Sequence, residues 1–302
     1  MEKVTAWAPG ICGELVQGVI DGNHVQVVCP IARYTRVTVA KAGEKVNICP
    51  KNSKLRDALQ RGLAALGLSF ADGLQVEIST ELLRAKGFGS SSADISAGLA
   101  ALARLYQREM TPEEIAAIAL QVEPTDGLMF PGLHLFDHRR GRVSEALGQP
   151  PSMEVLVFDF GGEMDSIDFF QREDLEEFNK AKEGVVRVAL ALIRDGLLQG
   201  RPDFIARAAT MSALANQEIN PKEGLEELAR LATSHLGALG LCIAHSGTIV
   251  GLLYPALDPF MIEETVREVT DRFGLNYLFH SPVIGGGLTL REPWEARTSA
   301  CG

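Results

Sequence analysis

The sequence predicts an α+β protein built in two parts, and three observations support that prediction. The chain has 302 residues, which at about 150 residues per domain suggests two domains or one large one. Its strand-like and helix-like segments do not alternate strictly, as a parallel βαβ series would. A Gly-Gln-Pro-Pro run at residues 148–151 interrupts the chain near its middle. We therefore expect an N-terminal domain over residues 1–152 and a C-terminal α+β domain over residues 153–302.

The first half begins with strands. Residues 4–8 are strand-like and lead into Pro9, and residues 24–30 and 34–40 are rich in Val and Thr. Residues 74–80 alternate between apolar and polar side chains. A helix is expected from Asn52 or Ser53 to about Leu66, where Gly67 ends it. A glycine-rich run begins at residue 86. A second helix is expected after it and ends at about Tyr106, because apolar residues recur there at helical spacing.

The next elements have clear boundary signals. Thr111 caps a helix with Pro112 in its first position, and Glu114 completes a capping box. A hairpin is expected from residues 133–136 and 142–145. The second half then predicts a strand at 153–160 and helices at 173–198, 203–218 and 221–235, followed by strand, strand, helix and strand at 239–245, 248–254, 259–273 and 276–291.

The composition excludes several classes of protein. Hydrophobic residues make up 46% of the chain, enough for a substantial core. The formal net charge of −10 argues against a nucleic-acid-binding protein, which would usually present a basic face. The start lacks the apolar stretch of a signal peptide, and no apolar run reaches the roughly 18 residues of a membrane span. Five cysteines without a Cys-x-x-Cys pair favour a reduced, cytoplasmic protein.

The glycine- and serine-rich run at residues 86–92 is the strongest functional signal. Glycine lets the backbone approach a ligand closely, and the helix that follows leaves its first N–H groups unpaired at the positive end of its dipole. That combination is typical of a phosphate-binding site. A lone Gly-x-Gly-Ser run is more often a loop with a capping serine, so the context matters. The expected ATP-binding residues are Lys86, Gly87, Phe88, Gly89, Ser90, Ser91 and Ser92.

Two further segments carry carboxylates. Residues 8–18 contain Pro9 and three glycines, which indicates an irregular loop, and Glu14 lies within it. Glu123 and Asp126 lie three residues apart on an expected turn after a helix. Either segment alone is compatible with a solvated turn. Phosphoryl transfer, however, requires a nucleotide cradle, a metal ion and often a carboxylate that orients the attacking hydroxyl.

Taken in this order, the three segments resemble the superfamily of small-molecule kinases that includes galactokinase, homoserine kinase, mevalonate kinase and phosphomevalonate kinase (GHMP). The resemblance covers nearly the whole chain, with Phe88 in place of the usual leucine of the phosphate loop. It implies a two-part fold with an N-terminal mixed β-sheet and helices and a C-terminal ferredoxin-like α/β sandwich. It also implies ATP and Mg²⁺ as cofactors. By position, Ser91 and Glu123 match the metal ligands, and Asp126 matches the catalytic base.

Within the superfamily the chain most resembles the L-threonine kinases of cobalamin synthesis. Residues 8–18, the Cys-Pro-Ile run at 29–31 and residues 123–132 carry this resemblance. It implies ATP-dependent phosphorylation of the L-threonine hydroxyl. A kinase for another small alcohol, such as homoserine or serine, and a nucleotide-binding regulator without catalysis are the alternatives.

Several points stay open from the sequence. The family's third, glycine-rich motif matches residues 245–247 better than the Ile-Gly-Gly-Gly run at 284–287, because strands flank the former. His134, Asp137, His138, Arg139 and Arg140 form a charged cluster that is expected to be a solvated hairpin. Glu14, Arg33 and Arg36 are candidates to bind the amino acid's charged groups. A homodimer is possible.

Overall fold

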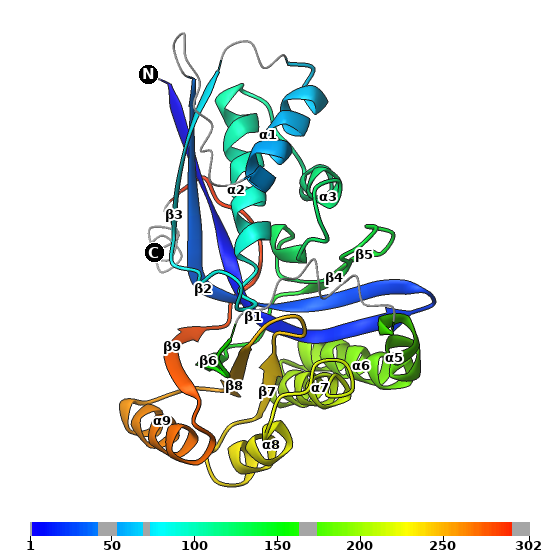
Figure 1. Cartoon of the computed structure of the whole chain (residues 1–302), viewed down its shortest axis with the longest axis vertical. Coiled ribbons are helices and arrows are strands. Elements are labelled where there is room, and N and C mark those ends of the chain that lie inside the picture. Colours follow the sequence, from blue (N-terminus) through cyan, green and yellow to red (C-terminus); the bar gives the residue numbers. More distant parts are fainter. Residues whose placement is uncertain (1, 42–52, 69–72, 163–173, 292–302) are drawn as a thin grey trace.

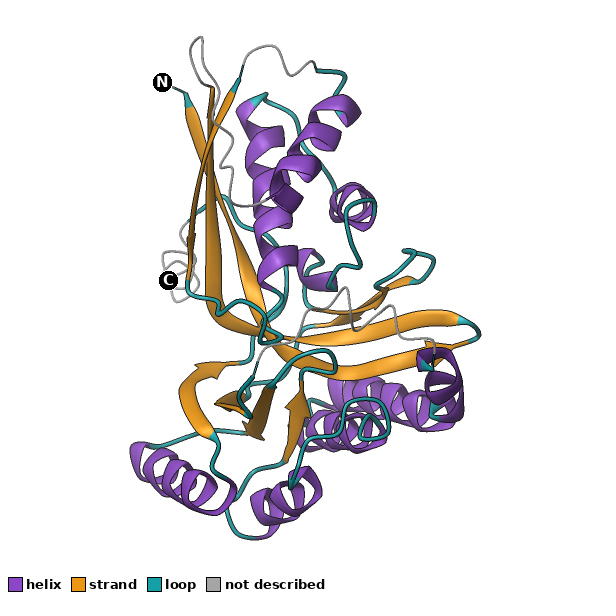
Figure 2. Cartoon of the chain, in the orientation of Figure 1, coloured by secondary structure: helices purple, strands orange, loops and turns teal. Residues whose placement is uncertain are grey.

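The computed structural model describes residues 2–41, 53–68, 73–162 and 174–291, and within them strands form one continuous sheet. The strand order is β5-β4-β2-β1-β7-β8-β6-β9, with β3 also paired to β2. Helices cover the sheet on both halves of the molecule, as Figures 1 and 2 show. The predicted α+β fold class is thus confirmed. Each strand pair in the described residues is antiparallel, so the N-terminal sheet that we expected to be mixed is antiparallel there.

Two long, paired strands form the centre of the N-terminal half. β1 spans Lys3–Ile20 and β2 spans Asn23–Lys41, and they are joined by a tight turn. The irregular loop expected at residues 8–18 is therefore wrong: this segment stays paired to β2. Its proline and glycines accompany register shifts, which lie between Pro9 and Gly10 and on both sides of Glu14. Such bulges bend a strand and redirect its side chains without ending it.

Helices pack on one face of this sheet in the order that the sequence predicts. α1 is Ser53–Ala65, β3 is Leu74–Thr80, α2 is Ser90–Leu105 and α3 is Pro112–Leu120. The capping box of Thr111 and Glu114 forms as expected. Asn52, the alternative cap of α1, lies outside the described residues. After the 3₁₀ turn Gly127–Met129, the predicted hairpin is formed by β4, Leu133–Asp137, and β5, Ser144–Gly148.

The C-terminal half contains four strands and five helices among the described residues. Its strands are β6, Glu154–Asp159; β7, Gly240–Ile243; β8, Ile249–Tyr254; and β9, Asn276–Pro282. Their spatial order, β9-β6-β8-β7, is that of a ferredoxin-like sheet. The helices are α5, Leu175–Ala181; α6, Glu183–Gln199; α7, Pro202–Ala215; α8, Leu225–Ser234; and α9, Pro259–Phe273. The one helix expected at 173–198 is thus two helices, which meet at Lys182.

The two halves share one sheet and one core. β1 pairs with β7 through Glu14 and Ile243, which joins the N-terminal strands to the C-terminal sheet. Gly13 makes this approach possible, because a side chain at this position would meet the Ile243 carbonyl oxygen at 2.2 Å. The largest hydrophobic cluster accordingly contains residues of both halves, such as Ile11 and Val155. The boundary at residue 152 stays a prediction.

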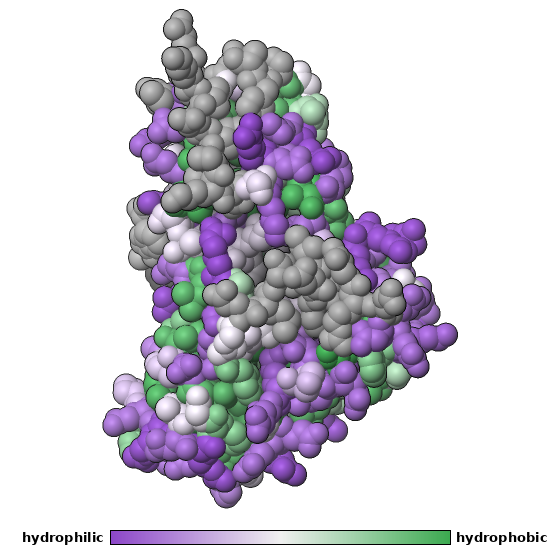
Figure 3. All heavy atoms as spheres, viewed as in Figure 1, coloured by the Kyte–Doolittle hydropathy of each residue, from purple (hydrophilic) through white to green (hydrophobic). Residues whose placement is uncertain are grey.

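The surface seen in Figure 3 is largely hydrophilic, with separate smaller hydrophobic areas. Large exposed apolar side chains include Leu198 at the end of α6 and Phe260 on α9. In the part of the chain that the structure describes, no helix is both long enough and apolar enough to cross a membrane.

Candidate active site

A cleft of about 590 Å³ lies where the phosphate loop, the start of α2 and the two long strands meet. Its walls come from segments that are far apart in the sequence. All three carboxylates singled out from the sequence border it: Glu14, Glu123 and Asp126. Residues 87–92 border it as well. The structure therefore brings the three predicted segments together around one cavity.

The phosphate loop has the backbone that its glycines suggest. Gly87 and Gly89 adopt positive φ angles of 102° and 65°, which glycine reaches at little cost. Gly89 is the N-terminal cap of α2, and no side chain caps the helix there. The first N–H groups of α2 are thus available to an anion in the cleft. Phe88 turns inward instead: its side chain is buried against Phe279, and its carbonyl accepts a hydrogen bond from Ile11 N–H.

Lys86 differs from the other loop residues. Its ammonium lies 2.8 Å from the Asp159 carboxylate at the end of β6, and Lys86 is not among the residues that border the cleft. Thr248 secures the same junction, because its backbone N–H donates to the Lys86 carbonyl and its hydroxyl donates to Asp159. The Lys86 ammonium thus ties the loop to the C-terminal half. Its direct contact with phosphate stays a prediction that requires the ammonium to leave Asp159.

The turn at residues 245–247 lies against the phosphate loop. A side chain at Gly247 would meet the Lys86 carbonyl oxygen at 2.4 Å, and one at Gly87 would meet the Ala244 methyl carbon at 2.1 Å. Ser246 borders the cleft. The glycine run at 284–287 lies elsewhere, where Gly286 bridges to Gly132. The geometry therefore agrees with the choice of residues 245–247 as the third motif.

Ser91 and Glu123 are in direct contact. The Ser91 hydroxyl donates to one oxygen of the Glu123 carboxylate, and the Lys54 ammonium lies 2.5 Å from the other. Glu123 is 7% exposed in its side chain, so the lysine cation compensates a largely buried charge. A hydroxyl and a carboxylate are the oxygen ligands that Mg²⁺ prefers. The Ser91 hydroxyl and the Glu123 carboxylate therefore fit as ligands of a magnesium ion, which would replace the lysine cation beside Glu123.

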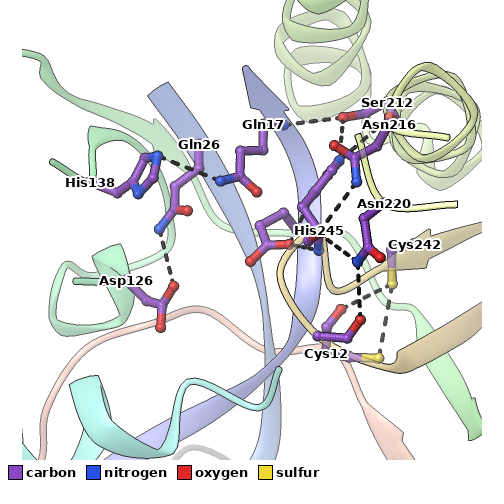
Figure 4. Close-up of polar contacts among 12 residues, drawn as sticks. Cys12, Gln17, Gln26, Asp126, His138, Ser212, Asn216, Asn220, Cys242 and His245 are labelled. Atoms are coloured by element: carbon purple, nitrogen blue, oxygen red, sulfur yellow. Dashed lines mark hydrogen bonds and ion pairs between the residues drawn. The ribbon is translucent and has the colours of Figure 1, made fainter. Parts of the chain in front are cut away.

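Asp126 lies at the N-terminus of α2. Its backbone N–H donates to the Ser92 hydroxyl, and that hydroxyl donates to its carboxylate, both at 3.0 Å. The Gln26 amide donates to its other oxygen at 3.3 Å (Figure 4). Burial raises the pKa of Asp126 to about 7, and the charge of Glu14 acts in the same direction. The side chain thus has a fixed orientation and a proton affinity in the range that suits a general base at neutral pH.

Glu14 is buried rather than solvated. One of its oxygens accepts hydrogen bonds from the backbone N–H of His245, at 2.8 Å, and contacts the ring Nδ1 at 3.0 Å. Burial raises the pKa of Glu14 to about 7, which the bond from His245 only partly opposes. His245 is itself anchored by Ser212 of α7, as Figure 4 shows. The histidine therefore has the structural role that a histidine at a strand end suggests.

One expectation about charged side chains is wrong. The hairpin cluster is not solvated as a whole, because His134, Asp137 and His138 are buried. Asp137 accepts hydrogen bonds from the backbone of the hairpin turn, while His138 borders the cleft. Arg33 and Arg36 do not border the cleft: the Arg33 guanidinium lies over Phe279, and Arg36 is exposed.

Other cleft residues were missed from the sequence. Gln17 and Gln26 are directly paired on β1 and β2, and both border the cavity. Their signal in the sequence is a polar residue inside an apolar strand. Lys54 at the start of α1 and Arg84 before the phosphate loop also border the cleft. Lys54 lies far from the three motifs in the sequence, and Arg84 precedes the phosphate loop without a pattern that marks it as functional.

Comparison with known proteins identifies the family. Residues 53–134 match the model of the GHMP kinases N terminal domain. An L-threonine kinase of Salmonella typhimurium is 31% identical over 250 residues, covering 82% of each chain. An L-threonine kinase of Citrobacter freundii is 28% identical and covers 82% of this chain and 85% of its own.

Solved structures of lower identity share the fold. A galactokinase of Lactococcus lactis complexed with galactose superposes with a TM-score of 0.71 at 13% identity, covering 96% of this chain and 95% of its own. A homoserine kinase of Cytophaga hutchinsonii gives a TM-score of 0.69 at 16% identity, with coverage of 96% and 97%. With a shared fold, a matching N-terminal domain and a relative above 30% identity, the chain belongs to the GHMP kinase family of ATP-dependent phosphotransferases.

Proposed function

We propose that this kinase transfers the γ-phosphoryl group of ATP to the side-chain hydroxyl of L-threonine, giving O-phospho-L-threonine for cobalamin synthesis. The observation that carries the catalytic part is Asp126, a partly buried carboxylate with a raised pKa held at the N-terminus of α2. The substrate is proposed from the two L-threonine kinases, whose similarity extends over 82% of the chain. Three described cysteines are free thiols, which agrees with the cytoplasm as the proposed location.

The phosphate loop would bind the nucleotide. The positive N-terminal end of α2, with the unpaired N–H groups of Ser90, Ser91 and Ser92, faces the cleft. These groups would hold the β- and γ-phosphates. Phosphoryl transfer depends mostly on positioning and on stabilising charge, and a fixed helix terminus supplies both without reorganising during the reaction.

Ser91 and Glu123 would hold the magnesium ion, which neutralises phosphate charge when it is bound. Lys54 would then be released from Glu123 and could compensate phosphate charge from the same wall of the cleft. This exchange of one cation for another keeps the buried Glu123 carboxylate paired throughout.

Asp126 would orient the threonine hydroxyl and accept its proton as the new P–O bond forms. Gln26 and Ser92 fix the carboxylate from two sides, which restricts the directions from which a hydroxyl can approach. Because the pKa of Asp126 is near 7, the group is substantially ionised at neutral pH and still takes up a proton readily.

ADP release from ATP and Mg²⁺ with a panel of L-threonine, L-serine and L-homoserine tests the proposal. Release with L-threonine at the highest kcat/KM supports it. A higher kcat/KM for homoserine or serine would assign the enzyme to that substrate, and ATP binding without any release would indicate a regulator.

A further inference from the structure

The floor of the cleft has two acceptor side chains on one strand. Glu14 and Gln17 lie three residues apart on β1, a spacing that places side chains on opposite faces of a regular strand. The register shift between Glu14 and Val16 changes this, and both side chains border the cleft. The bulge thus has a specific result: it adds a second polar side chain to the floor.

Gln17 is buried and only partly satisfied. The residue is 8% exposed, and its amide nitrogen lies 3.5 Å from His138 Nε2. Its carbonyl oxygen has no hydrogen-bond partner among the residues that the structure describes. Buried carbonyl oxygens normally have partners, because an unpaired one is costly. A buried acceptor at a cavity wall is therefore a binding feature for a donor that enters the cavity.

Glu14 adds charge to this floor. The residue is 6% exposed, and only one of its two oxygens is bonded to His245. Burial raises its pKa, so that its negative charge is incompletely compensated by the protein. A cation that reached Glu14 from the cleft would provide the missing compensation.

We propose that the carbonyl oxygen of Gln17 and the carboxylate of Glu14 bind the α-ammonium group of the substrate. An ammonium has three N–H donors and no acceptor, which suits two acceptors and would not suit a carboxylate. This inference rests on the proposed function and deepens it, because it makes the enzyme a kinase for vicinal amino alcohols.

The position of Gln17 relative to Asp126 fits such a substrate. Gln17 is paired across the strands with Gln26, which donates to Asp126, and the close-up shows the two glutamines side by side (Figure 4). Directly paired positions have Cβ atoms about 5 Å apart. The amino and hydroxyl groups of threonine are on adjacent carbons, so one group can contact Gln17 while the other contacts Asp126.

The test compares L-threonine with two analogues that each lack one charged group. (R)-3-Hydroxybutyrate lacks the ammonium, and (R)-1-amino-2-propanol lacks the carboxylate. The KM for L-threonine and the inhibition constants of both analogues are measured for the wild type, Gln17→Met, Gln17→Glu and the control Gln75→Met. Gln75 is exposed on β3, away from the cleft, so the control reports any general effect of the same substitution.

Gln17→Met is expected to weaken L-threonine and aminopropanol about 10- to 100-fold, the range for losing a hydrogen bond to a charged group. Hydroxybutyrate and ATP should change less than about threefold on the same basis. Gln17→Glu keeps an acceptor but not the donor to His138, so it should retain tight threonine binding.

Three results would overturn the inference while leaving the kinase assignment intact. They are an equal loss for all three compounds, a loss confined to the compounds with a carboxylate, and a Gln17→Glu variant as weak as Gln17→Met. A wild type that phosphorylates no amino alcohol would refute the proposed function itself, and the inference with it.

Discussion

The loop at residues 86–92 and the strand floor around Glu14 and Gln17 face the same cleft, yet they depend on different parts of the chain. The loop is a local structure: two glycines at positive φ and a helix N-terminus create it. The floor is assembled from β1, β2 and the turn after β7, through the bulge near Glu14 and the anchor at His245. Under the proposed function, local geometry would serve the nucleotide and assembled geometry would serve the substrate.

The largest effect is expected at the junction of the two regions. Asp126→Asn keeps the shape and removes the proton acceptor, so kcat should fall by about 10²- to 10⁴-fold while ATP affinity changes little. Steady-state kinetics and equilibrium nucleotide binding measure the two quantities. A fall of less than tenfold in a folded variant would mean that positioning alone drives the reaction and that Asp126 is not the base.

Gly89→Val should weaken nucleotide binding. The residue has φ of 65°, and a Cβ there would lie 3.0 Å from Asp126 Oδ2. Strain and crowding together should weaken ATP binding by about 100-fold. Gly274→Val is the matched control, since Gly274 has φ of 67° and no atom within 4 Å of its Cβ position. Equal ATP affinity in both variants would show that residues 86–92 do not bind the phosphates of ATP.

Glu123→Gln should alter the metal dependence. Loss of the charged oxygen should raise the Mg²⁺ concentration for half-maximal rate on the order of 10-fold. Titrations of activity against Mg²⁺ at fixed ATP measure this, with Glu113→Gln on the exposed face of α3 as the control. An unchanged midpoint would remove Glu123 from the metal site.

The smallest effect is on stability. Folding raises the pKa of Asp126 from 3.8 to about 7, so the folded state binds more protons than the unfolded state between these values. The stability of the wild type relative to Asp126→Asn should therefore fall as pH rises from about 4 to 7 and stay constant above. Three pKa units correspond to about 4 kcal/mol, so we expect the melting temperature of the variant to exceed that of the wild type by about 10 °C at pH 8, with a smaller difference at pH 5. A constant difference would show that the carboxyl has an ordinary pKa.

The same comparison explains what the sequence could predict. The helix that begins at Ser90 and the capping box at Thr111 depend on neighbours in the chain, and their patterns predicted them. Glu123 and Asp126 were singled out from the sequence, but their contacts with Ser91 and Ser92 come from the fold. The long β1 strand was expected to be a loop, because Pro9 and the glycines that form its bulges are also typical of turns. The position of Gln17 beside the cleft depends on its pairing with Gln26 on β2, which no local sequence pattern predicts.

Phosphorus NMR of the product tests the central claim most directly. The wild type is incubated with ATP, Mg²⁺ and L-threonine, and the new resonance is compared with authentic O-phospho-L-threonine. The proposed function predicts one new phosphomonoester that coincides with the standard and accumulates in step with ADP. Inorganic phosphate as the sole product, or ATP that remains intact beside bound threonine, would contradict the assignment of this enzyme as a threonine kinase.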